Sequence, residues 1–275
     1  MGHGRRYLVN CSILFAELPL LERPEAAKAA GFDAVEFWWP FPAAAPGDAE
    51  VDEFVAAVKD AGVQLVGLNF AAGDMPGGDR GLLSWPGRGA EFRDSVAIAV
   101  GIADQLGTEA FNALYGNRLD EVSADEQDDL AAANLAFAAE AAGRMGAVVL
   151  LEPVSGSPSY PLLCAADAVA AIERVQRASG ANNLRLLADL YHLSVNGDDL
   201  GEVVAQHADR VGHVQIADAP GRHEPGTGEL DLERHLGALE QAGYAGWVGL
   251  EYTPSTNTEE SLRWLPRERR AARQS

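Results

Sequence analysis

The segment from Val211 to Glu229 reads VGHVQIADAPGRHEPGTGE and changes character along its length. From Val211 to Asp218 apolar and polar residues alternate as in a short strand, whereas the remainder is a polar loop punctuated by glycine and proline. Side chains repeat every second residue along a strand, so His213 and Gln215 share one face. An imidazole and an amide among Val and Ile need polar partners. They form either a hydrogen-bonded core pair or part of a site at the strand end.

The same organisation recurs along the chain, where short strand-like runs alternate with amphipathic, alanine-rich helical runs. We expect strands at Tyr7–Cys11, Ala34–Phe37, Gln64–Asn69, Glu109–Leu114, Ala147–Glu152, Leu184–Asp189, Val211–Ile216 and Trp247–Glu251. We expect helices at Pro19–Ala30, Asp48–Ala61, Ala90–Leu106, Asp125–Arg144, Ala165–Ala178, Asp199–Ala208, Asp231–Ala242 and Thr258–Arg270. Eight βα units without a break in composition predict an α/β fold, a single (β/α)8 TIM-barrel domain over residues 1–275.

Polar side chains mark the ends of the last four predicted strands: Glu152, Asp189, Gln215 and Glu251. Active sites of such barrels lie at the carboxyl ends of the strands, so these groups converge on one mouth. Three carboxylates that close together need a counter-ion, and a divalent cation supplies one. An oxygen-rich ligand set suits Mg²⁺ or Mn²⁺ better than Zn²⁺. The structural alternative for each carboxylate is a helix N-cap or an arginine partner.

Three further residues are candidates for binding a substrate. His192 follows Asp189 closely and either contacts a substrate oxygen or packs at the barrel rim. Arg222, in the loop after the seventh strand, is the best-placed cation for an anionic substrate, and its alternative is surface solvation. Asn69 ends the third strand and either binds a ligand or caps the long glycine-rich loop that follows.

Aromatic residues follow the second strand in the run from Phe37 to Phe41. Phe37, Trp38 and Trp39 can exclude water from the pocket, and the alternatives are core packing or an interface in a homo-oligomer.

Charge and composition exclude several classes of protein. The formal net charge of −20 opposes binding to nucleic-acid phosphates. No apolar run is long enough to span a membrane, and Met1–Tyr7 lacks the apolar segment of a signal peptide, so we expect a soluble, cytoplasmic protein. Cys11 and Cys164 show no metal-ligand spacing, which argues against a disulfide framework or a cysteine-based zinc site. The only lysines, Lys28 and Lys59, lie in surface helices, so Schiff-base chemistry is disfavoured.

Several motifs together resemble the hydroxypyruvate isomerase family of xylose isomerase-like barrels. They are Asn69–Asp74 with Arg80-Gly81 and Pro86–Arg88, Leu151–Pro153, Asp189–His192, Gly212–Asp218, Glu224–Glu229, Gly246–Gly249 with Glu251-Tyr252, and Leu262–Trp264. The resemblance covers nearly the whole chain. It implies a metal held by Glu152, Asp189, Gln215 and Glu251, the residues already reached from the strand ends.

The resemblance further implies that Glu152 and Glu251 act as the catalytic acid and base, with His192 and Arg222 contacting the substrate. The expected reaction interconverts hydroxypyruvate and tartronate semialdehyde, a small anionic 2-oxo hydroxy acid pair, through an enediolate. In related ketose epimerases a histidine usually stands at the position of Gln215, and glutamine favours the hydroxypyruvate branch.

Three departures from the family pattern keep alternative substrates open. No histidine precedes Asn69, unlike in the family motif. The run from Arg222 to Pro225 is closer to that of a sister group that isomerises 2-oxo-tetronates. The loop Val154–Pro161 after Glu152 is longer than in the family, which can change the size of the pocket. A 2-oxo-tetronate isomerase and a ketose 3-epimerase therefore remain alternatives. An abasic-site endonuclease on the same barrel needs histidine-rich zinc sites and a basic DNA-binding face, neither of which the sequence indicates. A catalytically inactive barrel would have no reason to keep mutually repelling carboxylates.

Overall fold

All eight predicted strands form, and they pair in parallel in sequence order until β8 closes the ring against β1. The computed structural model describes residues 5–271, so the first four residues of the Met1–Tyr7 segment lie outside the described part. The strands are β1 (Arg6–Asn10), β2 (Ala34–Phe37), β3 (Gln64–Asn69), β4 (Ala110–Asn112), β5 (Val148–Leu151), β6 (Leu184–Asp189), β7 (Val211–Ile216) and β8 (Trp247–Leu250). The predicted TIM barrel is therefore confirmed.

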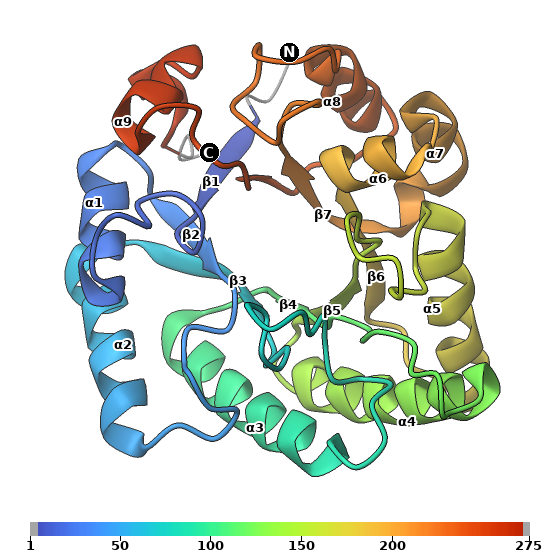
Figure 1. Cartoon of the computed structure of the whole chain (residues 1–275). Coiled ribbons are helices and arrows are strands. Elements are labelled where there is room, and N and C mark those ends of the chain that lie inside the picture. Colours follow the sequence, from blue (N-terminus) through green and yellow to red (C-terminus); the bar gives the residue numbers. More distant parts are fainter. Residues whose placement is uncertain (1–4, 272–275) are drawn as a thin grey trace.

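Helices encircle the barrel and cover its outer surface (Figure 1). They are α1 (Arg23–Ala29), α2 (Asp48–Ala61), α3 (Gly89–Leu106), α4 (Ala124–Gly143), α5 (Ala165–Ser179), α6 (Leu190–Asn196), α7 (Leu200–His207), α8 (Leu232–Gln241) and α9 (Thr258–Ser261). Single-turn 3-10 helices are η1 (Leu20–Glu22), η2 (Ala208–Arg210), η3 (Leu262–Trp264) and η4 (Arg267–Arg269). No helix within residues 5–271 is long and apolar enough to cross a bilayer.

Two predicted elements differ from the observed ones, and one observed helix was not predicted. The fourth strand is shorter than Glu109–Leu114, and the closing helix predicted at Thr258–Arg270 is broken into α9, η3 and η4, with Pro266 before the last turn. Proline removes a backbone donor and crowds the preceding turn, so one continuous helix is disfavoured there. Helix α6 was not predicted; it starts because Asp189 accepts hydrogen bonds from the backbone N–H groups of Tyr191 and His192.

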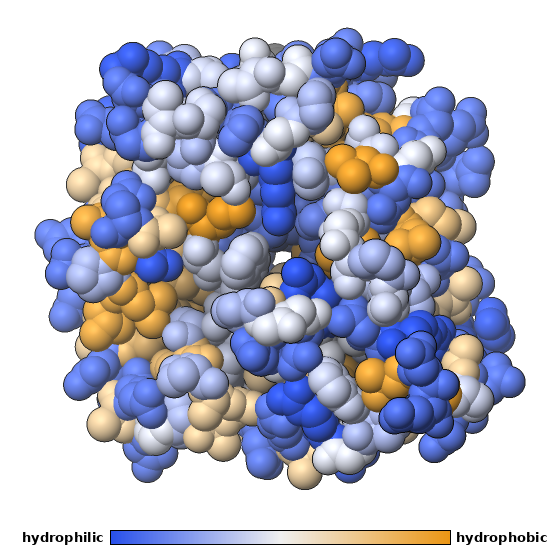
Figure 2. Space-filling model, in the orientation of Figure 1, coloured by the Kyte–Doolittle hydropathy of each residue, from blue (hydrophilic) through white to orange (hydrophobic). Residues whose placement is uncertain are grey.

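The barrel interior changes from apolar to polar along its axis. Near the amino ends of the strands, Leu8, Ala34, Val66 and Trp247 form a separate buried cluster. Two residues further along the same strands, Asn10 and Glu36 are buried as well, yet they are polar. Because alternate residues share a face, the interior positions at the carboxyl ends carry the polar groups. In Figure 2, this face of the molecule is hollowed near its centre, and many of the atoms around the opening are hydrophilic.

The long loop between β3 and α3 is fixed against its neighbours. Gly81 forms an antiparallel bridge with Tyr115, and buried Gln127 and Asn134 of α4 donate hydrogen bonds to the backbone carbonyls of Ser84 and Leu83. These contacts give the loop a defined path beside the barrel mouth, where its first half lines a cavity described below.

Substitution of Gly81 by alanine tests this packing. The φ of Gly81 is +116°, and a Cβ atom would lie 2.0 Å from the carbonyl oxygen of Leu114, whereas Gly78 at φ +110° has nothing within 4 Å. Both alanine variants share the backbone strain, so Gly81→Ala should lose about 1–3 kcal/mol more unfolding free energy than Gly78→Ala. Denaturant unfolding of both proteins measures this difference. Equal losses would contradict the close approach.

Candidate active site

Every strand supplies a polar side chain at or next to its carboxyl end. In strand order these are Asn10, Glu36, Asn69, Asn112, Glu152, Asp189, Gln215 and Glu251. All are buried except Asn69, which is partly exposed. The barrel thus brings residues from distant parts of the chain into one ring. The expected convergence of the last four is what the structure shows.

The carboxylates of Glu152, Asp189 and Glu251 lie close enough to share one cation. One oxygen from each, together with a ring nitrogen of His192, forms a group whose members all lie within 4.8 Å of one another. Oxygen ligands around a single Mg²⁺ or Mn²⁺ ion require separations of this order. The cluster includes His192, which was expected to bind substrate.

Two unpaired oxygen atoms support the fit of a metal ion. Oδ2 of Asp189 and Oε1 of Gln215 are buried without a hydrogen-bond partner in the described chain. The amide nitrogen of Gln215 donates to Oε2 of Glu251 at 2.6 Å and to Oε1 of Glu36 at 2.8 Å, which leaves its oxygen as the available ligand. Buried oxygens without donors are costly unless a cation or water binds them.

The structural alternatives considered for the carboxylates also hold in part. Oδ1 of Asp189 caps helix α6, and Oε1 of Glu251 accepts a hydrogen bond from Nη2 of Arg222 at 2.7 Å. Both oxygens of Glu251 thus accept hydrogen bonds from the protein scaffold, whereas Asp189 uses only Oδ1. For Asp189, the second oxygen remains without a partner.

Glu36 is a site residue that the sequence reasoning missed. Its carboxylate accepts hydrogen bonds from Nε2 of Gln215 at 2.8 Å and Nδ2 of Asn10 at 3.2 Å, and it lies 2.7 Å from Nε2 of His213. His213 therefore belongs to a buried hydrogen-bonded pair beneath the cluster, whereas Gln215 joins the cluster itself. Extending the strand-end rule to the residue before the last in the predicted strands Tyr7–Cys11 and Ala34–Phe37 would have found Asn10 and Glu36.

His192 presents a hydrogen-bond donor to the cluster. Its Nδ1 accepts the backbone N–H of Ser155 at 3.1 Å and lies 2.7 Å from the hydroxyl of the same residue. Because Nδ1 accepts, the neutral ring carries its proton on Nε2, which lies 3.9 Å from Glu152 and 3.8 Å from Asp189. An N–H group suits a substrate oxygen better than a metal ion.

Arg222 is positioned by a tightly held loop. Its φ is +59°, a conformation that residues other than glycine seldom adopt. Buried Asp218 fixes the loop by accepting backbone hydrogen bonds from Ala219, Gly226 and Leu230. The guanidinium of Arg222 consequently lies over the ring of Tyr191 and against Glu251. The contact of Arg222 with substrate stays a prediction. The structure shows in addition its ion pair with Glu251.

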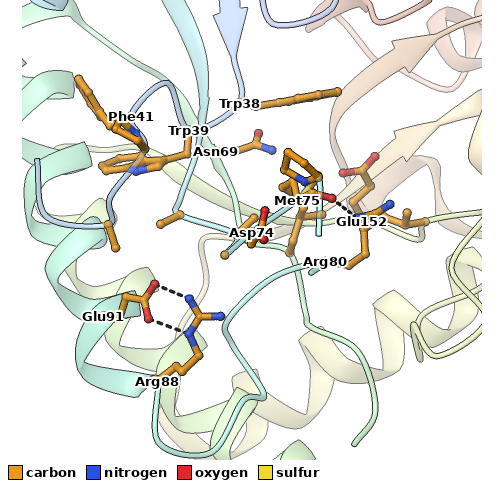
Figure 3. Close-up of a pocket in the computed structure, with 18 of the residues that line it drawn as sticks. Trp38, Trp39, Phe41, Asn69, Asp74, Met75, Arg80, Arg88, Glu91 and Glu152 are labelled. Carbon is orange, nitrogen blue, oxygen red and sulfur yellow. Dashed lines mark hydrogen bonds and ion pairs between the residues drawn. The ribbon is translucent and has the colours of Figure 1, made fainter. Parts of the chain in front are cut away.

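A cavity of about 860 Å³ opens above the cluster. Glu152, Glu251, His192, Arg222 and Asn69 all line it, and Figure 3 shows Trp38 and Trp39 on one side of the space. The expectation that Trp38 and Trp39 shield the pocket agrees with this placement.

Phe37 does not reach the cavity and packs instead edge-to-face against Phe54 in the core. Its side chain lies on the outer face of β2, opposite the interior face that carries Glu36.

Burial changes the protonation of the central groups. Removal from water raises the pKa of Glu152 to about 8, and the charge of Asp189 adds to this effect. Burial likewise raises the pKa of Glu251 well above its ordinary value, although Arg222 opposes the shift. The pKa of His192 is lowered by burial, which favours the neutral ring inferred from its hydrogen bonds.

Comparison with known proteins places this chain in a family. Residues 24–268 match the family model described as "Xylose isomerase-like TIM barrel". A putative hydroxypyruvate isomerase from Streptomyces coelicolor is 54% identical over 274 residues, which cover 98% of each chain. This chain belongs to the hydroxypyruvate isomerase family of xylose isomerase-like barrels. The resemblance read from the sequence motifs is confirmed.

Further similar proteins carry different names. Hydroxypyruvate isomerase from Escherichia coli and 2-oxo-tetronate isomerase from Cupriavidus necator are each 36% identical, with 94% of this chain covered and 98% and 97% of theirs. A solved structure from Brucella melitensis, described as an AP endonuclease of family 2, shares 34% identity with a TM-score of 0.84. It covers 94% of this chain and 97% of its own.

The raised pKa of Glu152 predicts how the stability of the metal-free protein depends on pH. A carboxyl group whose pKa is higher in the folded than in the unfolded chain binds its proton more tightly when folded, and so stabilises the fold at low pH. This contribution is complete below the unfolded pKa of about 4.3 and is lost as pH rises through about 8. In chelator, the melting temperature should therefore fall between pH 5 and pH 8 more steeply than for Glu152→Gln, whose amide does not titrate.

Thermal scans of both proteins in EDTA, with and without Mn²⁺, measure the effect. Added Mn²⁺ should weaken the pH dependence of the wild-type melting temperature, because the cation takes the place of the proton on Glu152. Parallel curves for the two proteins in EDTA would show that Glu152 does not titrate in this range.

Proposed function

We propose that this chain is a metal-dependent isomerase that interconverts hydroxypyruvate and tartronate semialdehyde. The observation that carries the proposal is the buried cluster of Glu152, Asp189 and Glu251 at the floor of a cavity, with unpaired oxygens on Asp189 and Gln215. Glu152, Asp189, Gln215 and Glu251 would hold Mg²⁺ or Mn²⁺. The names of the similar proteins support the substrate.

The reaction requires a proton shift between adjacent carbons. A base removes a proton from C3 of hydroxypyruvate to give an enediolate, and an acid returns a proton to C2, while the hydroxyl proton moves from the C3 oxygen to the C2 oxygen. When bound, a divalent cation stabilises the negative charge that develops on these oxygens. Glu152 and Glu251 both line the cavity, where each can exchange a proton with a bound substrate.

The surrounding residues orient the substrate and its proton donors. His192 offers its Nε2–H to a substrate oxygen, and Arg222 holds Glu251 while its own Nε remains buried without a partner in the described chain. Asn69 contributes an amide from the opposite side of the barrel. Trp38 and Trp39 limit the access of water, which strengthens these electrostatic contacts.

Isomerisation of a 2-oxo-tetronate is the second candidate. A cavity of about 860 Å³ has room for a substrate longer than three carbons, and the relative from Cupriavidus necator carries that name. A ketose 3-epimerase would use the same carboxylates on a neutral sugar. An AP endonuclease is disfavoured, because a chain with net charge −20 repels DNA phosphates.

Metal removal tests the proposed function directly. Protein stripped with chelator should not convert hydroxypyruvate, and added Mg²⁺ or Mn²⁺ should restore turnover because the cation stabilises the enediolate. Formation of tartronate semialdehyde is followed by coupling to a reductase. A folded protein that binds metal and leaves hydroxypyruvate unchanged would transfer the proposal to 2-oxo-tetronates, which are assayed in parallel with neutral ketoses.

Substitution of the two glutamates tests their roles. Glu152→Gln and Glu251→Gln should each lower kcat by at least about 100-fold, the usual contribution of a positioned acid or base. Glu140→Gln is the matched control, because Glu140 is an exposed helix residue paired only with Arg144 among the described residues. Circular dichroism verifies folding. Turnover retained in either active-site variant would remove that residue from the mechanism.

A further inference from the structure

Three arginines line the cavity, and two of them are already paired with carboxylates. Arg88 contacts Asp79 and Glu91, with two hydrogen bonds to Glu91, and Arg222 contacts Glu251. Arg80 has no carboxylate partner within residues 5–271. It is the one lining guanidinium of the described chain whose charge no carboxylate neutralises locally. The paired Arg88 and Glu91 and the separate Arg80 are visible in Figure 3.

The hydrogen bonds of Arg80 orient it for a bidentate contact. Its Nη1 donates to the backbone carbonyls of Met75 at 3.0 Å and of Asp79 at 2.6 Å. Nε and Nη2 have no hydrogen bond to another described residue. These two nitrogens form the lateral edge of the guanidinium, which matches the two oxygens of a carboxylate. The backbone carbonyls fix the side chain without using that edge.

The position of Arg80 complements that of Arg222. Arg80 lies in the loop after β3 and Arg222 in the loop after β7, and these strands are on opposite sides of the closed barrel. The carbonyl oxygen of Arg80 accepts the N–H of Gly116 after β4, and its side chain lines the same cavity as Arg222 and His192.

We propose that Arg80 binds the carboxylate of the substrate and makes the site selective for 2-oxo acids over neutral ketoses of the same length. The inference rests on the proposed isomerase function and names the chemical class of its substrate. An anionic substrate approaching several buried carboxylates needs a second cation besides the metal. The charge of Arg222 is paired with Glu251, whereas Arg80 has no carboxylate partner within residues 5–271, so we assign this role to Arg80.

Turnover of a matched substrate pair tests selectivity. Dihydroxyacetone is the neutral counterpart of hydroxypyruvate, with a hydroxymethyl group in place of the carboxylate. Arg80→Gln should lower kcat/KM for hydroxypyruvate by about 10- to 100-fold, the effect of losing a hydrogen-bonded charge contact. It should leave any activity on dihydroxyacetone within about twofold. Arg80→Lys keeps the charge but not the lateral edge, and should recover only part of the loss.

Binding without turnover keeps the inference separate from the proposed reaction. Glycerate carries the carboxylate but has no carbonyl to isomerise, and glycerol is its neutral counterpart. Calorimetry with Mn²⁺ present should show glycerate binding about 10-fold or more weaker to Arg80→Gln than to the wild type. Glycerol binding and the Kd for Mn²⁺ should not change. Arg144→Gln removes one exposed positive charge from the surface and controls for the net charge of the protein.

The outcomes are distinct. Weaker glycerate binding to Arg80→Gln, with an unchanged Kd for Mn²⁺, supports the carboxylate contact. If hydroxypyruvate is then not turned over, only the proposed reaction is wrong. Equal glycerate affinity in wild type and Arg80→Gln overturns the inference even if the wild type is an active isomerase. Absence of measurable glycerate binding by the wild type also overturns it.

Discussion

The repulsion between buried carboxylates at the barrel mouth is the constraint around which this protein is arranged. Glu36, Glu152, Asp189 and Glu251 come from four strands and are all nearly inaccessible to water. Burial without compensation would be strongly unfavourable. Part of the compensation comes from hydrogen-bond donors on the scaffold. These donors are Asn10, Asn112, Gln215, Arg222 and the backbone N–H groups at the start of α6. The carboxylate oxygens of Glu152, Asp189 and Glu251 meet in a group that could hold a metal ion.

The barrel makes such an arrangement possible because its interior is divided. An apolar layer near the amino ends of the strands, which includes Leu8 and Trp247, supplies the packing that holds the strands in register. The polar layer above it adds little hydrophobic stabilisation, and its side chains depend on hydrogen bonds for their orientation. The Glu36–His213 pair lies beneath the cluster and fixes the amide of Gln215. The cluster therefore rests on a layer of buried hydrogen bonds.

The arginines that line the cavity stand on loops rather than on strands. The β3–α3 loop is tied to its neighbours through Gly81 and carries Arg80 to the cavity. The β7–α8 loop is held by Asp218 and carries Arg222. In barrels of this kind the strand ends carry the catalytic groups and the loops vary, so one fold can serve different substrates.

The sequence by itself determined the eight βα units, the order of the strands and the positions of Glu152, Asp189, Gln215 and Glu251, because strand periodicity and strand-end polarity are local properties. Only the tertiary structure decided that Glu36 supports Gln215, that His213 belongs to the scaffold, and that Arg222 is paired with Glu251. These contacts join residues far apart in the chain. They depend on barrel closure and loop path, which no local pattern encodes.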